Sequence, residues 1–251
     1  KMKMPYNNES MGISAEVAIA KSFGIYVNPY YEDRSEPEIV ELLMDDDKIN
    51  KIFEKENIPE PVCHVAEGQN PVDFELAGGK TLSVKTNQGE FGKVAPLIIG
   101  RPTADTYFRH LRRYAKGFCL EDFLDENNIK MTNENKSEIF KRISINRPAM
   151  VVNMYWENLF DCDYYLHFFN LGSYADPLNN YLFLEKEQPP VWNNEKFSFT
   201  QSLKSWNESN TLKYCGVSMG EFQVHSNRNC FKFRFNMKGV MKLIKQGEIT
   251  L

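Results

Sequence analysis

The sequence lacks any long hydrophobic run. No part of its 251 residues approaches the roughly 18 consecutive apolar residues that a membrane helix needs. The start of the chain, KMKMPYNNES, contains no apolar core of the kind found in secretory signals. We therefore expect a cytoplasmic protein that does not enter a membrane.

Motifs for common cofactors are also missing. The five cysteines show no CxxC spacing, and the four histidines show no zinc-binding pattern. No glycine-rich phosphate loop of the Walker or GxGxxG type is present. These absences disfavour a disulfide scaffold, a zinc site and a nucleotide cofactor. With 42% hydrophobic and 25% charged residues, the composition is that of an ordinary folded protein.

The charge is unevenly distributed, although the formal net charge is only −4. Residues 32–60 contain eleven acidic and four basic side chains, which gives this segment a net charge of −7. Residues 101–117 and 221–251 each have a net charge of +4. We expect the acidic segment to avoid a polyanion. The two basic segments are compatible either with nucleic-acid binding or with a solvated surface.

Helical and strand patterns alternate along the chain, which is typical of an α/β protein. Ser14 as a cap and Gly24 as a stop predict a helix at residues 15–23, with Glu16 in its first turn. Further helices are predicted at 37–44, 45–56, 103–116, 133–143 and 238–245. Strands are predicted at 94–99, 149–155, 164–169, 181–184, 212–217, 221–225 and 230–235. No repeat or low-complexity linker divides the chain, so we expect a single domain spanning 1–251.

The stretch PVDFELAGGKTLSVK alternates strictly between apolar and polar residues on both sides of its two glycines, which predicts a β-hairpin. A two-residue turn would mix polar and apolar side chains on both faces. A three-residue turn at 78–80 instead places Asp73 opposite Lys85 and Glu75 opposite Ser83. It also gathers the apolar side chains on the other face, where burial would stabilise them.

An aspartate and a lysine on neighbouring rigid strands suit the hydrolysis of a phosphodiester. A carboxylate binds a hard cation such as Mg²⁺, which polarises a phosphoryl oxygen and acidifies a bound water. A nearby lysine can orient or deprotonate that water and offset the developing charge. The same pair would equally form an ordinary cross-strand salt bridge on an exposed sheet face.

The segments NPVD and LSVKTN, joined by a glycine-rich turn, resemble the active-site hairpin of the PD-(D/E)XK nuclease superfamily, above all its type II restriction endonucleases. Members usually have a helix with a glutamate before the hairpin and a strand and helix after it. The resemblance implies a restriction-endonuclease-like α/β fold, in which helices flank a central mixed β-sheet with the active-site hairpin. It implies a catalytic core at about 14–117, with DNA-recognition and dimer elements within 118–251.

The resemblance also assigns roles to residues of the hairpin. Asp73 would be the principal Mg²⁺ ligand, the backbone carbonyl of Val84 a second ligand, and Lys85 the catalytic lysine. Ser83 stands where the superfamily normally has Asp or Glu, so the motif is an SxK variant. Serine is a poor ligand for a hard cation, and another carboxylate would have to replace it. The candidates for this carboxylate are Glu16, which we prefer, Glu75, and Glu90.

The remaining residues would have to hold and read the DNA duplex. Phosphate contacts position a protein, and the basic side chains suited to them are Arg101, Arg109, Arg112, Arg113 and Lys116. Reading bases requires amides, hydroxyls and guanidinium groups that reach the major groove. The densest cluster of such groups consists of Gln223, His225, Asn227, Arg228 and Asn229. An ordinary Asn-rich turn would have the same composition.

Together these features predict a type II restriction endonuclease that hydrolyses double-stranded DNA at a specific sequence, with Mg²⁺ as cofactor. A homodimer is expected, because two active sites related by a twofold axis can address both strands of a palindrome. The resemblance also implies a partner DNA methyltransferase. The alternatives are a structure-specific or nicking nuclease with the same hairpin, and a non-catalytic DNA-binding protein whose site has degenerated at Ser83.

Overall fold

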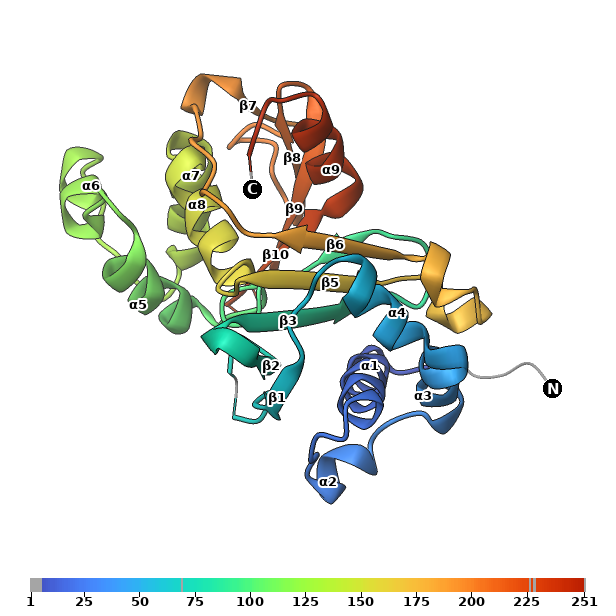
Figure 1. Cartoon of the computed structure of the whole chain (residues 1–251). Coiled ribbons are helices and arrows are strands. Elements are labelled where there is room, and N and C mark those ends of the chain that lie inside the picture. Colours follow the sequence, from blue (N-terminus) through green and yellow to red (C-terminus); the bar gives the residue numbers. More distant parts are fainter. Residues whose placement is uncertain (1–5, 69, 226, 228, 251) are drawn as a thin grey trace. The chain divides into compact units, whose positions relative to one another are not determined.

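The computed structural model describes residues 6–68, 70–225, 227 and 229–250 (Figure 1). The chain folds as two compact units. The first consists of Lys1–Gly92 and Phe160–Glu187, and the second of Lys93–Leu159 and Gln188–Leu251. The expectation of a single domain spanning the chain stays a prediction. Among the described helices, none has the length and the apolar composition needed to cross a membrane.

The first unit begins with helices α1 (Asn8–Ser22), α2 (Pro29–Glu32), α3 (Pro37–Met44) and α4 (Lys48–Lys55). α1 starts earlier than predicted because the Asn7 side chain accepts the N–H of Glu9 and caps the helix. The predicted cap at Ser14 is wrong. Ser14 is buried within α1, and its Oγ accepts the N–H of Glu36 at 2.7 Å, at the start of α3.

A mixed five-stranded sheet in the order β1-β2-β3-β5-β6 forms the centre of the first unit. Its strands are β1 (Pro61–His64), β2 (Phe74–Leu76), β3 (Thr81–Thr86), β5 (Tyr164–Phe168) and β6 (Tyr181–Glu185). β3 and β5 are parallel, and the other neighbouring strands are antiparallel. Leu82 and Val84 of β3 pack into one hydrophobic core with apolar side chains of α1. The predicted α/β class, with a mixed sheet and flanking helices, is confirmed.

β2 and β3 form the predicted hairpin in a register that differs by two residues. Glu75 lies opposite Thr81 and not opposite Ser83. The paired residues end at Phe74 and Leu82, so the predicted direct pairing of Asp73 with Lys85 is wrong. Because the difference is an even number of residues, the faces are unchanged. Glu75, Ser83 and Lys85 therefore still share one side of the hairpin.

The register follows from the conformation of the turn. The turn consists of residues 77–79 and not 78–80, and the N–H of Leu76 donates to the carbonyl of Lys80 at 2.7 Å across it. Gly78 and Gly79 have φ angles of 82° and 78°. Glycine adopts this left-handed conformation without the steric penalty of a Cβ atom. The glycine pair therefore occupies the last two turn positions.

The second unit contains an antiparallel sheet in the order β4-β10-β9-β8-β7. Its strands are β4 (Lys93–Val94), β7 (Phe197–Phe199), β8 (Ser209–Tyr214), β9 (Val217–His225) and β10 (Cys230–Asn236). Its helices are α5 (Ala104–Tyr114), α6 (Leu120–Glu126), α7 (Lys136–Asn146), α8 (Pro148–Leu159) and α9 (Met237–Lys245). Phe231 and Phe233 on β10 stack on Phe140 of α7 and Tyr155 of α8, with ring centroids 4.3 and 4.2 Å apart. One face of this sheet is therefore an aromatic core.

Two predicted strands of this unit are wrong. Residues 149–155 lie in α8, although their β-branched and aromatic composition favours a strand. Their buried side chains recur at helical spacing, and Pro148 occupies the first helical position. Of the strand predicted at 94–99, only Val94 belongs to a strand, and that strand joins the second sheet. The strand that follows the hairpin in the first sheet is β5.

Candidate active site

Asp73 lies where β2 separates from β3. Its N–H still donates to the carbonyl of Leu82 at 2.9 Å, and its carbonyl accepts the N–H of Val65 at 2.9 Å. The next bond of the ladder is made by the side chain, because Asp73 Oδ2 accepts the N–H of Val84 at 2.6 Å. The carboxylate therefore lies close to the plane of the sheet, at the end of the β2–β3 pairing, and not on an open sheet face.

Glu16 is a carboxylate that α1 carries into the interior, where it is 6% exposed. The Tyr31 hydroxyl donates to its Oε2 at 2.9 Å, and the His64 Nε2 lies 2.9 Å from its Oε1. The His64 ring packs between Tyr31 and Phe74, with ring centroids 5.0 and 5.1 Å apart. Phe74 belongs to β2. The stack therefore fixes Glu16 relative to the hairpin that carries Asp73.

The electrostatics show that Asp73, Glu16 and Lys85 are close together. Burial and, second, the negative charge of Glu16 raise the pKa of Asp73 to about 7. The Lys85 ammonium and the Val84 N–H act in the opposite direction. Burial and the charge of Glu16 also raise the pKa of Tyr31. Two carboxylates and one lysine thus lie together with little access to water. A bound cation would offset the repulsion between the two carboxylates.

Lys85 lies beside a neutral hydrogen-bonded network on β5. It is in register with His167, which is fully buried. His167 Nδ1 lies 3.0 Å from the Tyr165 hydroxyl and its Nε2 2.6 Å from Asn87 Oδ1. Burial and the nearby charge of Lys85 lower the pKa of His167 to about 3. An imidazole protonated only on Nε2 satisfies both bonds, so it adds no positive charge next to Lys85.

The other predicted residues of the hairpin region lie less favourably. Ser83 is fully buried, and its Oγ has no hydrogen-bond partner among the described residues. Glu75 is exposed on β2, whereas the second carboxylate that acts on Asp73 is Glu16. Glu90 lies in an exposed bend after β3. The roles assigned to these residues and to the Val84 carbonyl stay predictions.

The arrangement can bind a small hard cation only if backbone oxygens and water complete the ligands that the side chains supply. Within the described residues, no group of three or more His, Cys, Asp or Glu side chains is arranged to hold a metal ion. The available oxygens are those of Asp73, Glu16 and the backbone, and Mg²⁺ is commonly bound through one or two carboxylates with water completing its shell. The residues present therefore fit Mg²⁺.

Two residues of this site escaped the sequence analysis. His64 and Tyr31 hold both oxygens of Glu16, but nothing in their spacing links them to Glu16 along the chain. The only usable signal is the apolar and β-branched character of the short segment that ends at His64, which would have suggested a strand pairing with the hairpin. The ring of Tyr31 comes from a four-residue helix that has no sequence signature of a site.

The basic residues predicted on the helix at 103–116 lie on α5 and just after it. Arg109, Arg112 and Arg113 are exposed, as expected for phosphate contacts. Arg112 Nε is 2.8 Å from an oxygen of Glu121, and Lys116 Nζ is 2.9 Å from an oxygen of Glu157. Part of this positive charge is therefore already paired within the second unit.

The residues predicted to read bases lie at the β9–β10 hairpin. Gln223 and His225 are on β9, Asn229 is in the turn that precedes β10, and Asn227 is exposed. Arg228 lies outside the described residues. Arg101 is not part of α5, because the helix begins at Ala104. It lies instead in the segment that runs beside β10, where the N–H groups of β10 donate to the carbonyls of residues 100 and 102.

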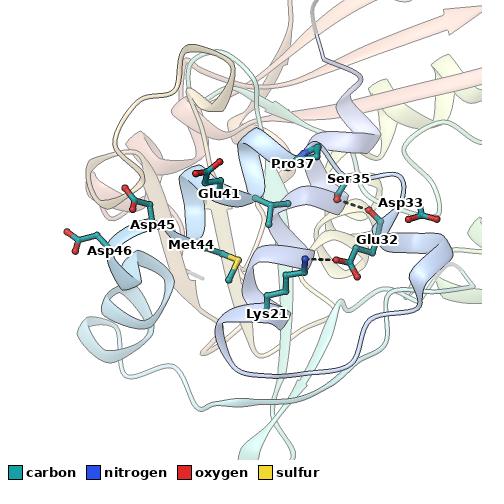
Figure 2. Close-up of a pocket in the computed structure, with 10 residues that line it drawn as sticks. Lys21, Glu32, Asp33, Ser35, Pro37, Glu41, Met44, Asp45 and Asp46 are labelled. Atoms are coloured by element: carbon teal, nitrogen blue, oxygen red, sulfur yellow. Dashed lines mark hydrogen bonds and ion pairs between the residues drawn. The ribbon is translucent and has the colours of Figure 1, made fainter.

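A separate open cavity of about 730 Å³ lies between α1, α2 and α3 (Figure 2). It is lined by Glu32, Asp33, Glu41, Asp45 and Asp46, with Lys21 paired to Glu32 at 2.5 Å. None of the residues that surround Asp73 lines it. Its negative charge disfavours a nucleic-acid ligand, in agreement with the expectation from residues 32–60.

The chain resembles one curated protein over most of its length. It is 27% identical over 230 residues to the type II restriction enzyme CviAII of Paramecium bursaria Chlorella virus 1, and the aligned region covers 90% of this chain. The same region covers 57% of that relative, so the chain spans little more than half of its length. No family model matches the chain. No solved structure matches it either.

Proposed function

We propose that the chain is a Mg²⁺-dependent endonuclease of the PD-(D/E)XK type, in its SxK variant, that hydrolyses double-stranded DNA at a specific sequence. The observation that carries this proposal is the meeting of Asp73, Glu16 and Lys85 at the point where β2 separates from β3. The similarity to a type II restriction enzyme supports the substrate and the sequence specificity. Palindromic specificity further favours a homodimer and a partner DNA methyltransferase that protects the host's own sites.

Each residue of the site has a proposed role. Asp73 and Glu16, with the carbonyl of Val84, would hold Mg²⁺. When bound, Mg²⁺ would polarise a phosphoryl oxygen and acidify a water. Lys85 orients the attacking water and offsets the negative charge that grows on the phosphate as the P–O ester bond breaks. Tyr31 and His64 are positioning residues, because they act through Glu16.

The proposal is tested by incubating supercoiled plasmid with the protein and Mg²⁺. The wild-type chain is expected to yield discrete linear fragments. Asp73→Ala and Lys85→Ala are each expected to lower the rate of cutting by about 10³-fold or more, because each removes a group that contacts the reacting atoms. Glu16→Gln is expected to lower it by about 10²-fold. Cleavage that is unchanged in the first two variants would refute the site.

Glu75→Gln is the matched control on the same hairpin. It removes one carboxylate from an exposed position opposite Thr81, and it is expected to change the rate less than threefold. Loss of cutting in Glu75→Gln with retention in Glu16→Gln would instead make Glu75 the second ligand. Open circular product from the wild-type chain would indicate a nicking nuclease. A mobility shift without cleavage would indicate a DNA-binding protein with a degenerate site.

A further inference from the structure

The second sheet has a polar face on the side opposite its aromatic core. Along β9 and β10, buried residues alternate with partly exposed ones. Gln223 lies opposite Lys232 on one side and opposite Ser209 of β8 on the other. In the next row, Glu221 lies between Arg234 and Thr211. The α9 helix packs against β9 near Ser218, close to Gly239, and leaves these rows partly exposed.

Arg101 continues the row of Gln223 on the far side of β10, in the irregular segment that precedes α5. Thr103 forms an isolated antiparallel bridge with Cys230. Phe231 and Phe233 donate their N–H groups to the carbonyls of residues 102 and 100 at 3.0 and 2.9 Å. Two residues along this register, Arg101 lies opposite Lys232, and paired residues of an antiparallel ladder point to the same side. Pro102 supplies no N–H, which explains why this edge is not a regular strand.

The row Arg101–Lys232–Gln223–Ser209 therefore places two cations side by side. Like charges directly opposite one another on a sheet are destabilising. In the neighbouring row, by contrast, Arg234 is 2.8 Å from Glu221 Oε1, and Lys93 Nζ is 2.6 Å from Glu221 Oε2. Among the described residues, no ion pair is formed by Arg101 or Lys232. A polyanion is the partner that would relieve their repulsion.

We propose that this polar face binds duplex DNA, with Arg101 and Lys232 on phosphates and Gln223 on a base edge. The proposal rests on the nuclease function above and identifies how the same chain holds its substrate. At a base edge in the major groove, the amide of glutamine can pair with adenine through two hydrogen bonds. His225, next to Gln223 on the same side of β9, has a buried Nε2 with no partner among the described residues.

The proposal combines residues that were singled out separately in the sequence. Arg101 was grouped with the cations of α5, and Gln223 with the hairpin tip. The register places them in one row and joins to them Lys232 and Ser209, neither of which was predicted. Duplex DNA offers phosphates to the cations at one edge of the row and base edges to the neutral hydrogen-bonding groups at its centre.

The test is DNA binding by the full 251-residue chain, measured by fluorescence anisotropy with a labelled duplex in EDTA, at several salt concentrations. The double variant Arg101→Ala/Lys232→Ala is expected to bind at least tenfold more weakly at low salt. Its plot of log K against log salt should be less steep by about 1.8, because each lost phosphate contact removes about 0.9 from the slope. Thermal unfolding checks that the double variant is folded.

The matched control is Lys130→Ala/Lys204→Ala, which removes the same charge from exposed loop positions of the second unit. It is expected to bind within twofold of the wild type and to keep the salt slope. Equal loss of affinity in both double variants would refute the proposed face, and so would wild-type affinity and salt slope in Arg101→Ala/Lys232→Ala. Absence of DNA binding by the wild type would also refute it.

Gln223→Ala separates base reading from general attraction. Its affinity for a duplex of random sequence is expected to stay within twofold, while cutting at the wild-type sites slows by about 5- to 150-fold. Unchanged cutting at those sites would remove Gln223 from the proposed contacts. The binding measurements need no cleavage. DNA binding through this face without cutting would therefore refute the nuclease function alone. A cutting rate that is unchanged in Arg101→Ala/Lys232→Ala would refute this inference alone.

Discussion

The two sheets of this protein carry their polar groups in opposite ways. In the first sheet, charged side chains meet at one partly buried junction, and the buried Glu16 accepts hydrogen bonds there from side chains of α2 and β1. In the second sheet, polar side chains lie in rows on a partly exposed face above an aromatic core. The geometry of the junction depends on individual hydrogen bonds, whereas DNA binding by the polar face depends on the total charge of several side chains. A single substitution at the junction should therefore change both stability and activity, whereas one on the polar face should change DNA binding with little effect on stability.

The largest expected effect on stability lies under the polar face. Phe233 is fully buried and stacks on Tyr155 at 4.2 Å. It also fills the space above Gly220, where an added Cβ would lie 2.8 Å from the ring. Phe233→Ala should lower the free energy of unfolding by about 3–5 kcal/mol, because it leaves a cavity in a closely packed core. Urea denaturation measures the change.

The neighbouring residue on the exposed side is the control for this prediction. Lys232→Ala should change the free energy of unfolding by no more than about 0.5 kcal/mol, as is usual for a surface position. If the two substitutions destabilised the protein equally, the division of this sheet into a structural and a binding face would be wrong.

The second prediction concerns the buried charge of the first sheet. The pKa of Asp73 is raised from 3.8 to about 7 in the folded protein. The folded state therefore holds a proton that the unfolded state has released, and metal-free protein should lose stability as the pH rises from about 4 to about 7. Asp73→Asn keeps an oxygen for the Val84 N–H and removes the charge. At pH 8 without divalent ions it should be more stable than the wild type by about 2–3 kcal/mol.

Thermal unfolding between pH 4 and pH 8 measures this difference. Mg²⁺ should raise the melting temperature of the wild type at pH 8 and leave that of Asp73→Asn unchanged, because binding to the folded state alone is stabilising. A lower melting temperature for metal-free Asp73→Asn at pH 8 would contradict the prediction.

The faces of the hairpin could be predicted from the sequence, and its register could not. Alternation of apolar and polar residues is local, and it is preserved by any shift of two residues. The shift itself depends on which residues adopt left-handed φ angles, and here these are Gly78 and Gly79 at the end of the turn. The proximity of Glu16 to Asp73 agrees with its position in a helix before the hairpin, which is a general feature of the resemblance.

The partners of Glu16 and the row on the second sheet could not be predicted, because both depend on contacts between distant segments. His64 reaches Glu16 across 48 positions of the sequence. Arg101 meets Lys232 only because an irregular segment pairs with β10. The strand predicted at 149–155 is wrong for a different reason: its β-branched and aromatic residues favour a strand, whereas its buried residues follow the helical spacing that α8 adopts.

The third prediction tests how strongly the junction depends on single atoms. Tyr31→Phe keeps the ring that packs on His64 and removes the hydroxyl that donates to Glu16. It should lower stability by about 1 kcal/mol. It should also raise the Mg²⁺ concentration needed for half-maximal cutting by about 10- to 100-fold, as is typical when a metal ligand loses the group that orients it. Cutting rates over a Mg²⁺ titration separate this effect from a loss of folded protein.

The matched control is the neighbouring tyrosine. Tyr30 is 84% exposed, and Tyr30→Phe should change neither stability nor the Mg²⁺ titration. Equal behaviour of the two variants would show that the hydroxyl of Tyr31 does not support Glu16.

The smallest effect is expected for a charge reversal on the polar face. Arg101→Glu replaces a repulsion with Lys232 by an attraction across the strand pair. It should raise the free energy of unfolding by about 0.2–1 kcal/mol at low salt, and the gain should fade as salt screens the charges. The same substitution should weaken DNA binding, so stability and function move in opposite directions. Arg109→Glu is the control, because Arg109 lies near Asp105 on α5 and its reversal should destabilise. Combining Arg101→Glu with Lys232→Glu should abolish the gain, since two like charges again face each other; a gain that persists would show that Lys232 is not its source.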